Sequence, residues 1–168
     1  MALVYLSLGS NKGDRVGFIQ QATSLLNEDK QVELIRTSAF YETEPWQTDS
    51  SNWFVNAVIE IKTGYPPEDL LKLCNCVEAK LGRDREAEGF YGDRTIDIDI
   101  LFYDKEIIYT ENLVIPHKYF HKRAFTLVPM LELSPDFVHP ELKKSVMELH
   151  DELENPEMVF LYGTRVDV

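Results

Sequence analysis

Hydrophobic positions near the start of the chain predict a strand followed by an amphipathic helix. Residues 2–9, ALVYLSLG, form an apolar run that predicts a buried strand ending at a glycine. Beyond the loop SNKGD, one helical face would carry the apolar residues Phe18, Ile19, Ala22, Leu25 and Leu26. This spacing predicts a helix that is capped by Asp14 and extends to about Asn27.

The next segments continue the alternation of strands with a second helix. Residues 32–43 are rich in residues that favour extended chain. Residues 53–63 alternate between two faces, one with Val55, Ala57, Ile59 and Ile61, the other with Phe54, Asn56, Val58 and Glu60. Pro66 and Pro67 predict the start of a helix that closes at Gly82. Residues 104–110 predict a turn and a short returning strand.

The stretch DRTIDIDILFY, residues 93–103, combines strand periodicity with two aspartates. The isoleucines alternate with Asp97 and Asp99, so the two carboxylates share one face. Aspartate is a poor strand former, and like charges one pleat repeat apart repel each other. A solvated face is one explanation. However, the apolar surroundings predict an interior position in the sheet, where two ionised carboxylates need a cation. Mg²⁺ suits them, since it completes its octahedron with water and phosphate oxygens.

The order of these elements predicts the fold class. The first hundred residues are expected to run β-α-β-β-α-β, the order of a ferredoxin-like split βαβ fold of the α+β class. Two helices would cover one face of an antiparallel sheet and leave the other face free for a ligand. Residues 116–137 and 142–156 predict additional C-terminal helices on that face, and residues 157–163 predict a last strand. Without repeats or linkers, residues 1–168 are expected to form a single domain.

Composition narrows the class of partner and the compartment. The chain has 168 residues, 44% of them hydrophobic, and a net charge of −12, which argues against a broad nucleic-acid-binding surface. No apolar run is long enough for a bilayer span, and no signal peptide is recognisable at the start. Cys74 and Cys76 are expected to be free thiols in a reducing cytoplasm. Two cysteines are also too few for a structural zinc site without histidine ligands.

Basic residues flank the aspartate strand on both sides. Three of the chain's seven arginines, Arg83, Arg85 and Arg94, precede it. The positions that follow it are His117, Lys118, His121, Lys122 and Arg123. Guanidinium groups match phosphate geometry, so a polyphosphate site is the favoured interpretation, with ordinary salt bridges as the alternative. The two histidines, four residues apart, leave a zinc pair open as a weaker alternative.

Two further features bear on a ligand. The loop GSNKGD is not a Walker A motif, and a tight turn from strand to helix is its expected role, although its N–H groups could meet a ligand. Several aromatic residues lie near polar loops, where most could be core residues, but an aromatic pair around Asn56 would suit a flat heterocycle with donors and acceptors.

Together, YLSLGSNKGD, FYETEP, FVNAV, GDRTIDIDIL and IPHKYFHKRAF resemble the 6-hydroxymethyl-7,8-dihydropterin pyrophosphokinase family. The resemblance covers nearly the whole chain, in order. It implies a ferredoxin-like enzyme of folate biosynthesis that transfers the β,γ-diphosphate of ATP to the pterin's hydroxymethyl group and releases AMP. It further implies a Mg²⁺-dependent diphosphokinase with two Mg²⁺ ions, and ATP and the pterin as small-molecule substrates. A cytoplasmic monomer without nucleic-acid or membrane partners is expected.

The resemblance also implies a role for each site residue. Asp97 and Asp99 would hold the two Mg²⁺ ions, while Arg83 and Arg94 would be catalytic and neutralise charge on the transferred group. The implied nucleotide-binding positions are Glu78, Arg85, Tyr91, Ile100, His117, Lys118 and Arg123. The implied pterin-binding positions are Thr43, Pro45, Trp46, Phe54, Asn56 and Phe125, with Phe54 and Phe125 on either side of the ring.

Three departures from the family pattern and two rival functions accompany this interpretation. Arg85 and Tyr91 fall in a loop expected to close over the substrates, in a form one residue longer than usual. Asn112 stands where some members have an arginine, and the segment after Ser134 matches loosely and receives no role. One rival is a metal-dependent phosphohydrolase that uses the carboxylates and the histidines. The other is a noncatalytic ligand-binding module, which would tolerate the loss of Arg83.

Overall fold

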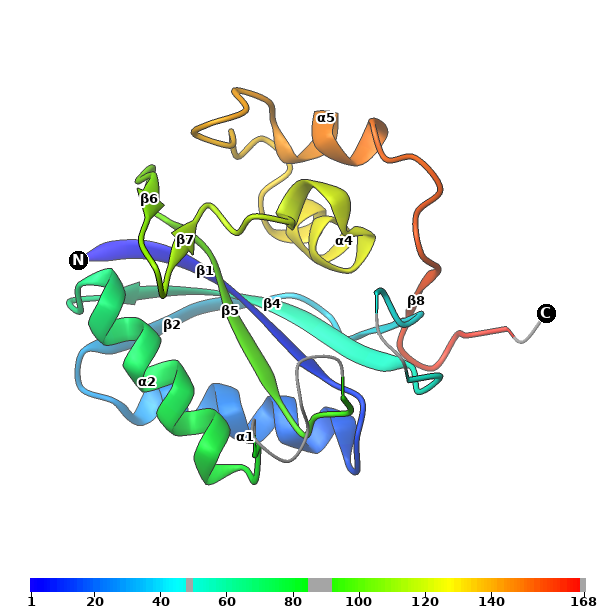
Figure 1. Ribbon diagram of the computed structural model, residues 1–168, viewed down its shortest axis with the longest axis horizontal. Coiled ribbons are helices and arrows are strands. Elements are labelled where there is room, and N and C mark those ends of the chain that lie inside the picture. Colours follow the sequence, from blue (N-terminus) through cyan, green and yellow to red (C-terminus); the bar gives the residue numbers. More distant parts are fainter. Residues whose placement is uncertain (48–49, 85–91, 167–168) are drawn as a thin grey trace.

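The computed structural model describes residues 1–47, 50–84 and 92–166, and its centre is an antiparallel sheet with helices on both faces (Figure 1). The strands of this sheet among the described residues are β1 (Ala2–Ser10), β2 (Val32–Thr37), β3 (Tyr41–Thr43), β4 (Phe54–Thr63), β5 (Asp97–Tyr103) and β8 (Val159–Leu161). Their order is β5-β1-β4-β3-β8, and β2 also pairs with β4. The predicted strand at 32–43 is thus divided in two, and the ferredoxin-like fold is confirmed.

Helices α1 (Arg15–Glu28) and α2 (Pro67–Lys80) cover one face of the sheet, as predicted. Asp14 caps α1, because its Oδ1 accepts the N–H of Gly17 at 3.1 Å. Gly82 follows α2 with a φ of +86°, a conformation that favours glycine. The core under these helices contains the predicted inward residues of β4, namely Val55, Ala57, Ile59 and Ile61.

Helices α4 (Ala124–Leu133) and α5 (Val146–Asp151) cover part of the opposite face and form a second core with it. Both are shorter than the sequence predicted. A 3₁₀ turn, Phe120–Lys122, precedes α4 instead of a continuous helix, because Arg123 is extended. Ser145 starts α5 with a capping box, since its side chain accepts from the backbone of Glu148 while the Glu148 side chain accepts in return.

Two expectations about strand pairing are wrong. β5 does not lie in the interior of the sheet, since it pairs with β1 alone among the described strands and forms an edge. Its apolar character comes from packing on its faces, and the outward N–H of Ile98 donates to Glu78 Oε2 at 2.9 Å. The strand after the turn at Asp104, β6 (Ile108–Tyr109), pairs with β7 (Val114–Ile115) rather than with β5.

The remaining sequence expectations concern the thiols and the membrane. Cys74 is buried and Cys76 exposed, and neither is in a disulfide. Burial raises the pKa of Cys74 to about 12, so this thiol is unreactive at neutral pH. No helix in the described part of the chain is long and apolar enough to cross a membrane.

His139 gives the fold a pH dependence that can be tested. The side chain is 3% exposed, and its Nδ1 accepts the N–H groups of Glu141 and Leu142 at 3.2 and 3.0 Å. Burial, assisted by the charge of His121, lowers the pKa of His139 to about 4. In the unfolded chain the pKa of a histidine is about 6.5. The free energy of unfolding therefore falls as the pH is lowered from about 6.5 to about 4, because the unfolded chain binds this proton more readily than the folded protein does.

We therefore expect wild-type protein to lose about 2 kcal/mol of unfolding free energy, relative to His139→Asn, between pH 7.5 and pH 5. The asparagine keeps an acceptor for the two N–H groups but does not titrate. Urea titrations of both proteins at the two pH values measure the difference. Parallel pH profiles for the two proteins would contradict the assignment.

Candidate active site

The half of the sheet face that α4 leaves uncovered forms the floor of a cavity of about 1010 Å³. Strands β1, β4 and β5 supply the floor, including Ser7, Gly9 and Asn56. Helix α2 forms one wall, and the opposite wall comes from the chain after β3 and the segment from β7 to the start of α4. Both flanks of the aspartate strand therefore meet at one cavity.

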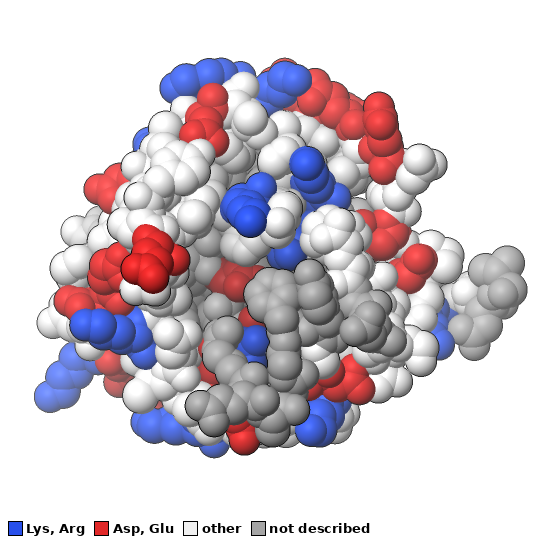
Figure 2. All heavy atoms as spheres, viewed as in Figure 1, with Lys and Arg blue, Asp and Glu red and all other residues white. Residues whose placement is uncertain are grey.

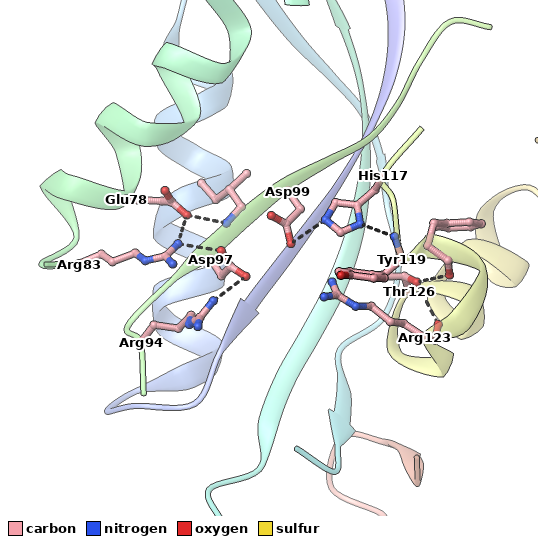
Figure 3. Close-up of polar contacts among 11 residues, drawn as sticks. Glu78, Arg83, Arg94, Asp97, Asp99, His117, Tyr119, Arg123 and Thr126 are labelled. Carbon is pink, nitrogen blue, oxygen red and sulfur yellow. Dashed lines mark hydrogen bonds and ion pairs between the residues drawn. The ribbon is translucent and has the colours of Figure 1, made fainter. Parts of the chain in front are cut away.

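Asp97 and Asp99 lie on the cavity floor with both carboxylates on the same face of β5 (Figure 3). Asp97 Oδ1 accepts from Arg83 Nη1 at 2.7 Å, and its Oδ2 accepts from Arg94 Nη1 at 3.3 Å. The Arg83 guanidinium also donates to the buried carboxylate of Glu78. Asp97 is thus the carboxylate that the loop arginines neutralise.

Asp99 faces the other basic flank. Its Oδ2 lies 3.9 Å from His117 Nε2. Burial, followed by the charge of Asp97, raises the pKa of Asp99 to about 7, although the charge of Arg123 opposes this shift. The pKa of His117 is lowered to about 4 by its own burial and then by the charge of Arg123. In the ligand-free protein, Asp99 therefore has less compensation for its charge than Asp97.

His117 is oriented by its neighbour. Its Nδ1 accepts the backbone N–H of Tyr119 at 3.2 Å (Figure 3). A neutral imidazole that accepts at Nδ1 carries its proton on Nε2, and this nitrogen points toward Asp99. The histidine consequently presents a fixed hydrogen-bond donor to the cavity. His121 lies elsewhere, with its ring 6.4 Å from that of His139, and no cluster of metal-ligand side chains is found among the described residues.

Arg123 lies among aromatic rings on the cavity wall opposite α2. Its guanidinium carbon is 4.6 Å from the ring centre of Trp46, 5.1 Å from Phe125 and 5.2 Å from Tyr119. Its Nε is buried and has no hydrogen-bond partner among the described residues. A buried donor without a partner is costly, so this guanidinium is poised for an anionic ligand.

The aromatic end of the cavity is organised around Asn56. Asn56 Nδ2 donates to Thr43 Oγ1 at 2.6 Å, which fixes the side-chain amide between β3 and β4. A Cβ atom added to Gly9 would lie 2.4 Å from Asn56 Oδ1, so only glycine leaves room for this amide. The half-buried rings of Phe54 and Phe125 also line this end.

Strand register sets the spacing between the two ends. Gly9 on β1 pairs with Asp97 on β5 and with Asn56 on β4, so the three residues form one row across the sheet. Neighbouring strands are about 4.8 Å apart, which places the backbone of Asp97 and Asn56 roughly 10 Å from each other. The cavity therefore joins a charged end and an aromatic end at a fixed spacing.

Asn11, in the loop that follows β1, supports this arrangement from outside the cavity. Asn11 Oδ1 accepts the N–H of Arg94 at 2.8 Å, and the N–H of Asn11 donates to the carbonyl of Arg94 at 3.1 Å. Asn11 Nδ2 also donates to Asp93 Oδ1 at 2.9 Å, and Asn52 Nδ2 donates to Asp93 Oδ2 at 2.7 Å. The loop thus clamps the backbone that carries a predicted catalytic arginine and does not itself contact the cavity through Asn11.

Most of the site residues expected from the sequence meet at this cavity. Those on its wall are Thr43, Trp46, Phe54, Asn56, Arg83, Arg94, Asp97, Asp99, Ile100, His117, Lys118, Arg123 and Phe125. Asn112 lines it as well, whereas Pro45 does not. Glu78 is 1% exposed and lies beneath the wall, so it holds Arg83 rather than facing the cavity. Arg85 and Tyr91 lie outside the described residues.

The sequence of this chain matches a known protein family. The profile of the family described as 7,8-dihydro-6-hydroxymethylpterin-pyrophosphokinase matches residues 5–135. The chain is 41% identical over 138 residues to the 2-amino-4-hydroxy-6-hydroxymethyldihydropteridine pyrophosphokinase of Methylorubrum extorquens, covering 82% of this chain and 86% of that protein. The chain belongs to the dihydropterin pyrophosphokinase family. This confirms the resemblance found in the sequence motifs.

Other members of the pyrophosphokinase family agree in sequence or fold. The enzyme of the same name from Aquifex aeolicus is 40% identical over 152 residues, covering 90% of this chain and 92% of that protein. The crystal structure of Plasmodium falciparum HPPK-DHPS with pteroate has the same fold, with a TM-score of 0.74 at 17% identity. The match covers 90% of this chain but 42% of the Plasmodium chain, so the chain spans less than half of that protein.

Sequence reasoning missed several residues of the pyrophosphokinase site. Helix α2 contributes Glu68, Leu71, Lys72 and Asn75 to the cavity wall. Their spacing of three and four residues was a usable signal, because it places them on one helical face. Tyr119 was missed although it lies within a recognised motif. The clamp by Asn11 left no local signal, because it depends on a contact with residues more than eighty positions away.

The Asn11 clamp predicts a specific catalytic defect. In Asn11→Ala, the N–H of Arg94 and the carboxylate of Asp93 lose their shared partner. We expect kcat for pyrophosphoryl transfer to fall by about 10–100-fold, because small misplacements of catalytic groups have effects of this size. The KM for the pterin should change little. Steady-state kinetics of the folded variant measure both quantities.

Asn52→Ala is the matched control, because Asn52 donates to the same carboxylate of Asp93. It should reduce kcat much less than Asn11→Ala. Similar losses in the two variants would show that Asp93, and not the backbone of Arg94, is what the clamp controls.

Proposed function

We propose that this cavity binds Mg²⁺-ATP at its charged end and 6-hydroxymethyl-7,8-dihydropterin at its aromatic end. The activity itself, pyrophosphoryl transfer in folate biosynthesis, follows from membership of the family. The observation that carries the assignment is the row Asp97, Gly9 and Asn56 across β5, β1 and β4. It supports the proposal, because carboxylates that could bind a metal and an amide that could bind a heterocycle lie on one floor, at a spacing suited to a pterin and a polyphosphate.

The carboxylate pair fits Mg²⁺. This ion commonly uses one or two protein carboxylates and takes its other ligands from water and phosphate. Asp97 and Asp99 offer that number, and burial together with the charge of Asp97 raises the pKa of Asp99 despite the opposing charges of Arg123 and Arg83, which supports a place for a cation there. We expect Asp97 and Asp99 to hold two ions. Bound there, Mg²⁺ would neutralise phosphate charge and align the reacting oxygens.

The arginines act on the transferred group. The pterin hydroxymethyl oxygen loses its proton to solvent and forms a bond to the β-phosphorus of ATP, while the bond from that phosphorus to the oxygen it shares with the α-phosphorus breaks, so AMP leaves with that oxygen. Arg83 and Arg94 already lie against Asp97, and they would turn toward the polyphosphate as its charge arrives. Arg123, with its unpartnered Nε, and Lys118 would bind the nucleotide phosphates from the opposite wall.

The remaining residues orient the substrates. Asn56 would bind the polar edge of the pterin, with Thr43 fixing the direction of its amide. Phe54 and Phe125 would enclose the ring and exclude water. His117 would donate from Nε2 to a phosphate oxygen, since Nδ1 is occupied by the N–H of Tyr119. Its lowered pKa keeps it neutral, so it would act as a donor and not as an additional cation.

We further infer a single-domain monomer that works in the cytoplasm. Strands β5, β1 and β4, helix α2 and the start of α4 supply the cavity wall, so one chain is sufficient to build the site. The free thiols Cys74 and Cys76 suit a reducing compartment in which ATP is abundant.

Product analysis tests the proposed reaction. Protein, ATP, Mg²⁺ and 6-hydroxymethyl-7,8-dihydropterin are mixed, and the adenine nucleotides are separated. We expect AMP that forms only when the pterin is present. ADP with a monophosphorylated pterin would indicate a simple kinase, and phosphate release without pterin would favour the hydrolase. Binding without turnover would favour the noncatalytic module.

Asp99→Asn tests the charge balance at the metal site. Ionised Asp99 destabilises the ligand-free fold, because its pKa is raised; this penalty is absent at low pH and complete above pH 7. We expect the variant to melt above wild type at pH 8 without Mg²⁺, by about 2–4 °C for each kcal/mol gained. The gain should shrink at pH 5, where wild-type Asp99 is largely protonated.

The same variant should lose nearly all turnover at saturating Mg²⁺, since one of the two carboxylates is neutral. Thermal melts at both pH values, with and without Mg²⁺-ATP, make the comparison. A variant with normal turnover, or one less stable than wild type at pH 8, would disprove the metal-binding role of Asp99.

A further inference from the structure

The C-terminal segment, residues 157–161, contacts two parts of the chain that line the aromatic end of the cavity. One is β3 with the residue after it, Glu44, and the other is the start of α4. It lies beyond the part of the chain matched by the family profile, residues 5–135. In Figure 1 the chain descends from α5 past α4 and enters the sheet as β8. β8 pairs with β3, with Val159 opposite Thr43. The segment therefore joins the wall that carries Thr43 to the helix that carries Phe125.

Hydrogen bonds of its main chain attach the segment to Glu44, directly after β3. The N–H of Glu44 donates to the carbonyl of Met158 at 2.9 Å, and the N–H of Met158 donates to Glu44 Oε2 at 3.2 Å. Glu44 is itself a cavity residue, two positions before Trp46. These bonds fix the position of the neighbouring residue, Glu157, relative to the cavity.

Glu157 attaches the segment to the start of α4. Helix α4 begins at Ala124 without a side-chain cap at Arg123 and without an acidic residue in its first turn. Glu157 Oε1 instead accepts the N–H of Phe125 at 2.8 Å. The positive charge of Arg123 attracts this half-buried carboxylate. A residue 32 positions away in sequence thus caps the first turn of α4, which carries Phe125 and directly follows Arg123.

The position of this cap gives it a functional consequence. A helix without a cap frays at its first turn, since its N–H groups have no partners inside the helix. The first turn of α4 holds Phe125, proposed to contact the pterin, and follows Arg123, proposed to contact the nucleotide. Fraying would move the Phe125 ring away from Phe54 and widen the pterin site. Loss of the cap should therefore weaken pterin binding as well as lower the stability of the fold.

We propose that Glu157 is a positioning residue for the pterin site, which acts by holding the first turn of α4 against the wall formed by Thr43 and Trp46. This inference rests on the proposed function, because it takes Phe125 as a wall of the pterin site. Glu157 does not contact the reacting atoms. Its effect on the reaction is transmitted through the backbone of Phe125.

Four variants test the proposal: Glu157→Ala removes the acceptor, Glu157→Gln keeps a neutral acceptor of the same length, Glu157→Asp keeps the charge but shortens the reach, and Glu154→Ala is the control. Glu154 is an exposed carboxylate of the same segment of chain, so its loss changes the net charge equally. Calorimetry measures the pterin Kd in the presence of Mg²⁺ and α,β-methylene-ATP, which resists cleavage. The Kd of the nucleotide alone and the melting temperature are measured for each protein.

We expect Glu157→Ala and Glu157→Asp to weaken pterin binding about tenfold, the effect of losing a helix cap. Glu157→Gln should stay within about threefold of wild type, because it retains the hydrogen bond at the cost of the charge. Glu154→Ala should bind as wild type does. The Kd of the nucleotide alone should change less than that of the pterin in every variant.

Pterin affinity that is unchanged in folded Glu157→Ala or Glu157→Asp would overturn the proposal, even if the melting temperature fell. Equal weakening in Glu157→Gln and Glu157→Ala would also overturn it, since the hydrogen bond would then not be the cause. Phe125→Ala separates the two levels of inference. Normal pterin binding in Phe125→Ala would refute the proposed pterin site itself, whereas weak binding there with normal binding in Glu157→Asp would refute the role of Glu157 alone.

Discussion

The repulsion between Asp97 and Asp99 is the constraint on which the rest of the site depends. Two carboxylates on one strand face, one pleat repeat apart, need compensation that neighbouring apolar side chains cannot supply. The structure divides the task, because Arg83 and Arg94 contact Asp97 directly, while Asp99 lies 3.9 Å from the neutral His117 and interacts with the charges of Arg123 and Arg83 at longer range. The pair is thus half-compensated without a ligand, which leaves a defined place for a cation.

This division depends on a carboxylate that does not reach the cavity. Glu78 is buried at the end of α2, where it accepts from the Arg83 guanidinium and from the N–H of Ile98 between the two aspartates. Glu78 therefore fixes the position of Arg83 and accepts the N–H of Ile98 at the open edge of β5. These two bonds also hold α2 against β5. Its own burial is tolerable because it has a cation and a backbone donor as partners. Supporting groups of this kind keep a polar site rigid before its substrates arrive.

Local patterns predicted most of the helices and strands, and the resemblance to the pyrophosphokinase family indicated about half of the residues that line the cavity. Alternation in residues 53–63 and at Asp97 and Asp99 identified the faces correctly, since side-chain direction in a strand is a local property. The edge position of β5 was missed because an apolar strand sequence indicates that the faces of the strand are buried. It does not indicate whether the strand has one neighbouring strand or two. The contacts of Asn11 with Arg94 and of Glu157 with Phe125 join distant segments, so their partners are decided by topology.

The charge distribution explains which form of the nucleotide the cavity suits. With a net charge of −12, most of the surface repels a polyphosphate, and in Figure 2 a group of basic side chains lies near the centre of a face flanked by acidic ones. Within the cavity, Asp97 and Asp99 would repel a bare polyphosphate, and Arg83, Arg94 and Arg123 would repel a bare metal ion. Neither component alone matches both signs of charge. The Mg²⁺ complex of the nucleotide proposed above would match both signs, because it would bring cations to the aspartates and oxygens to the arginines in a single ligand.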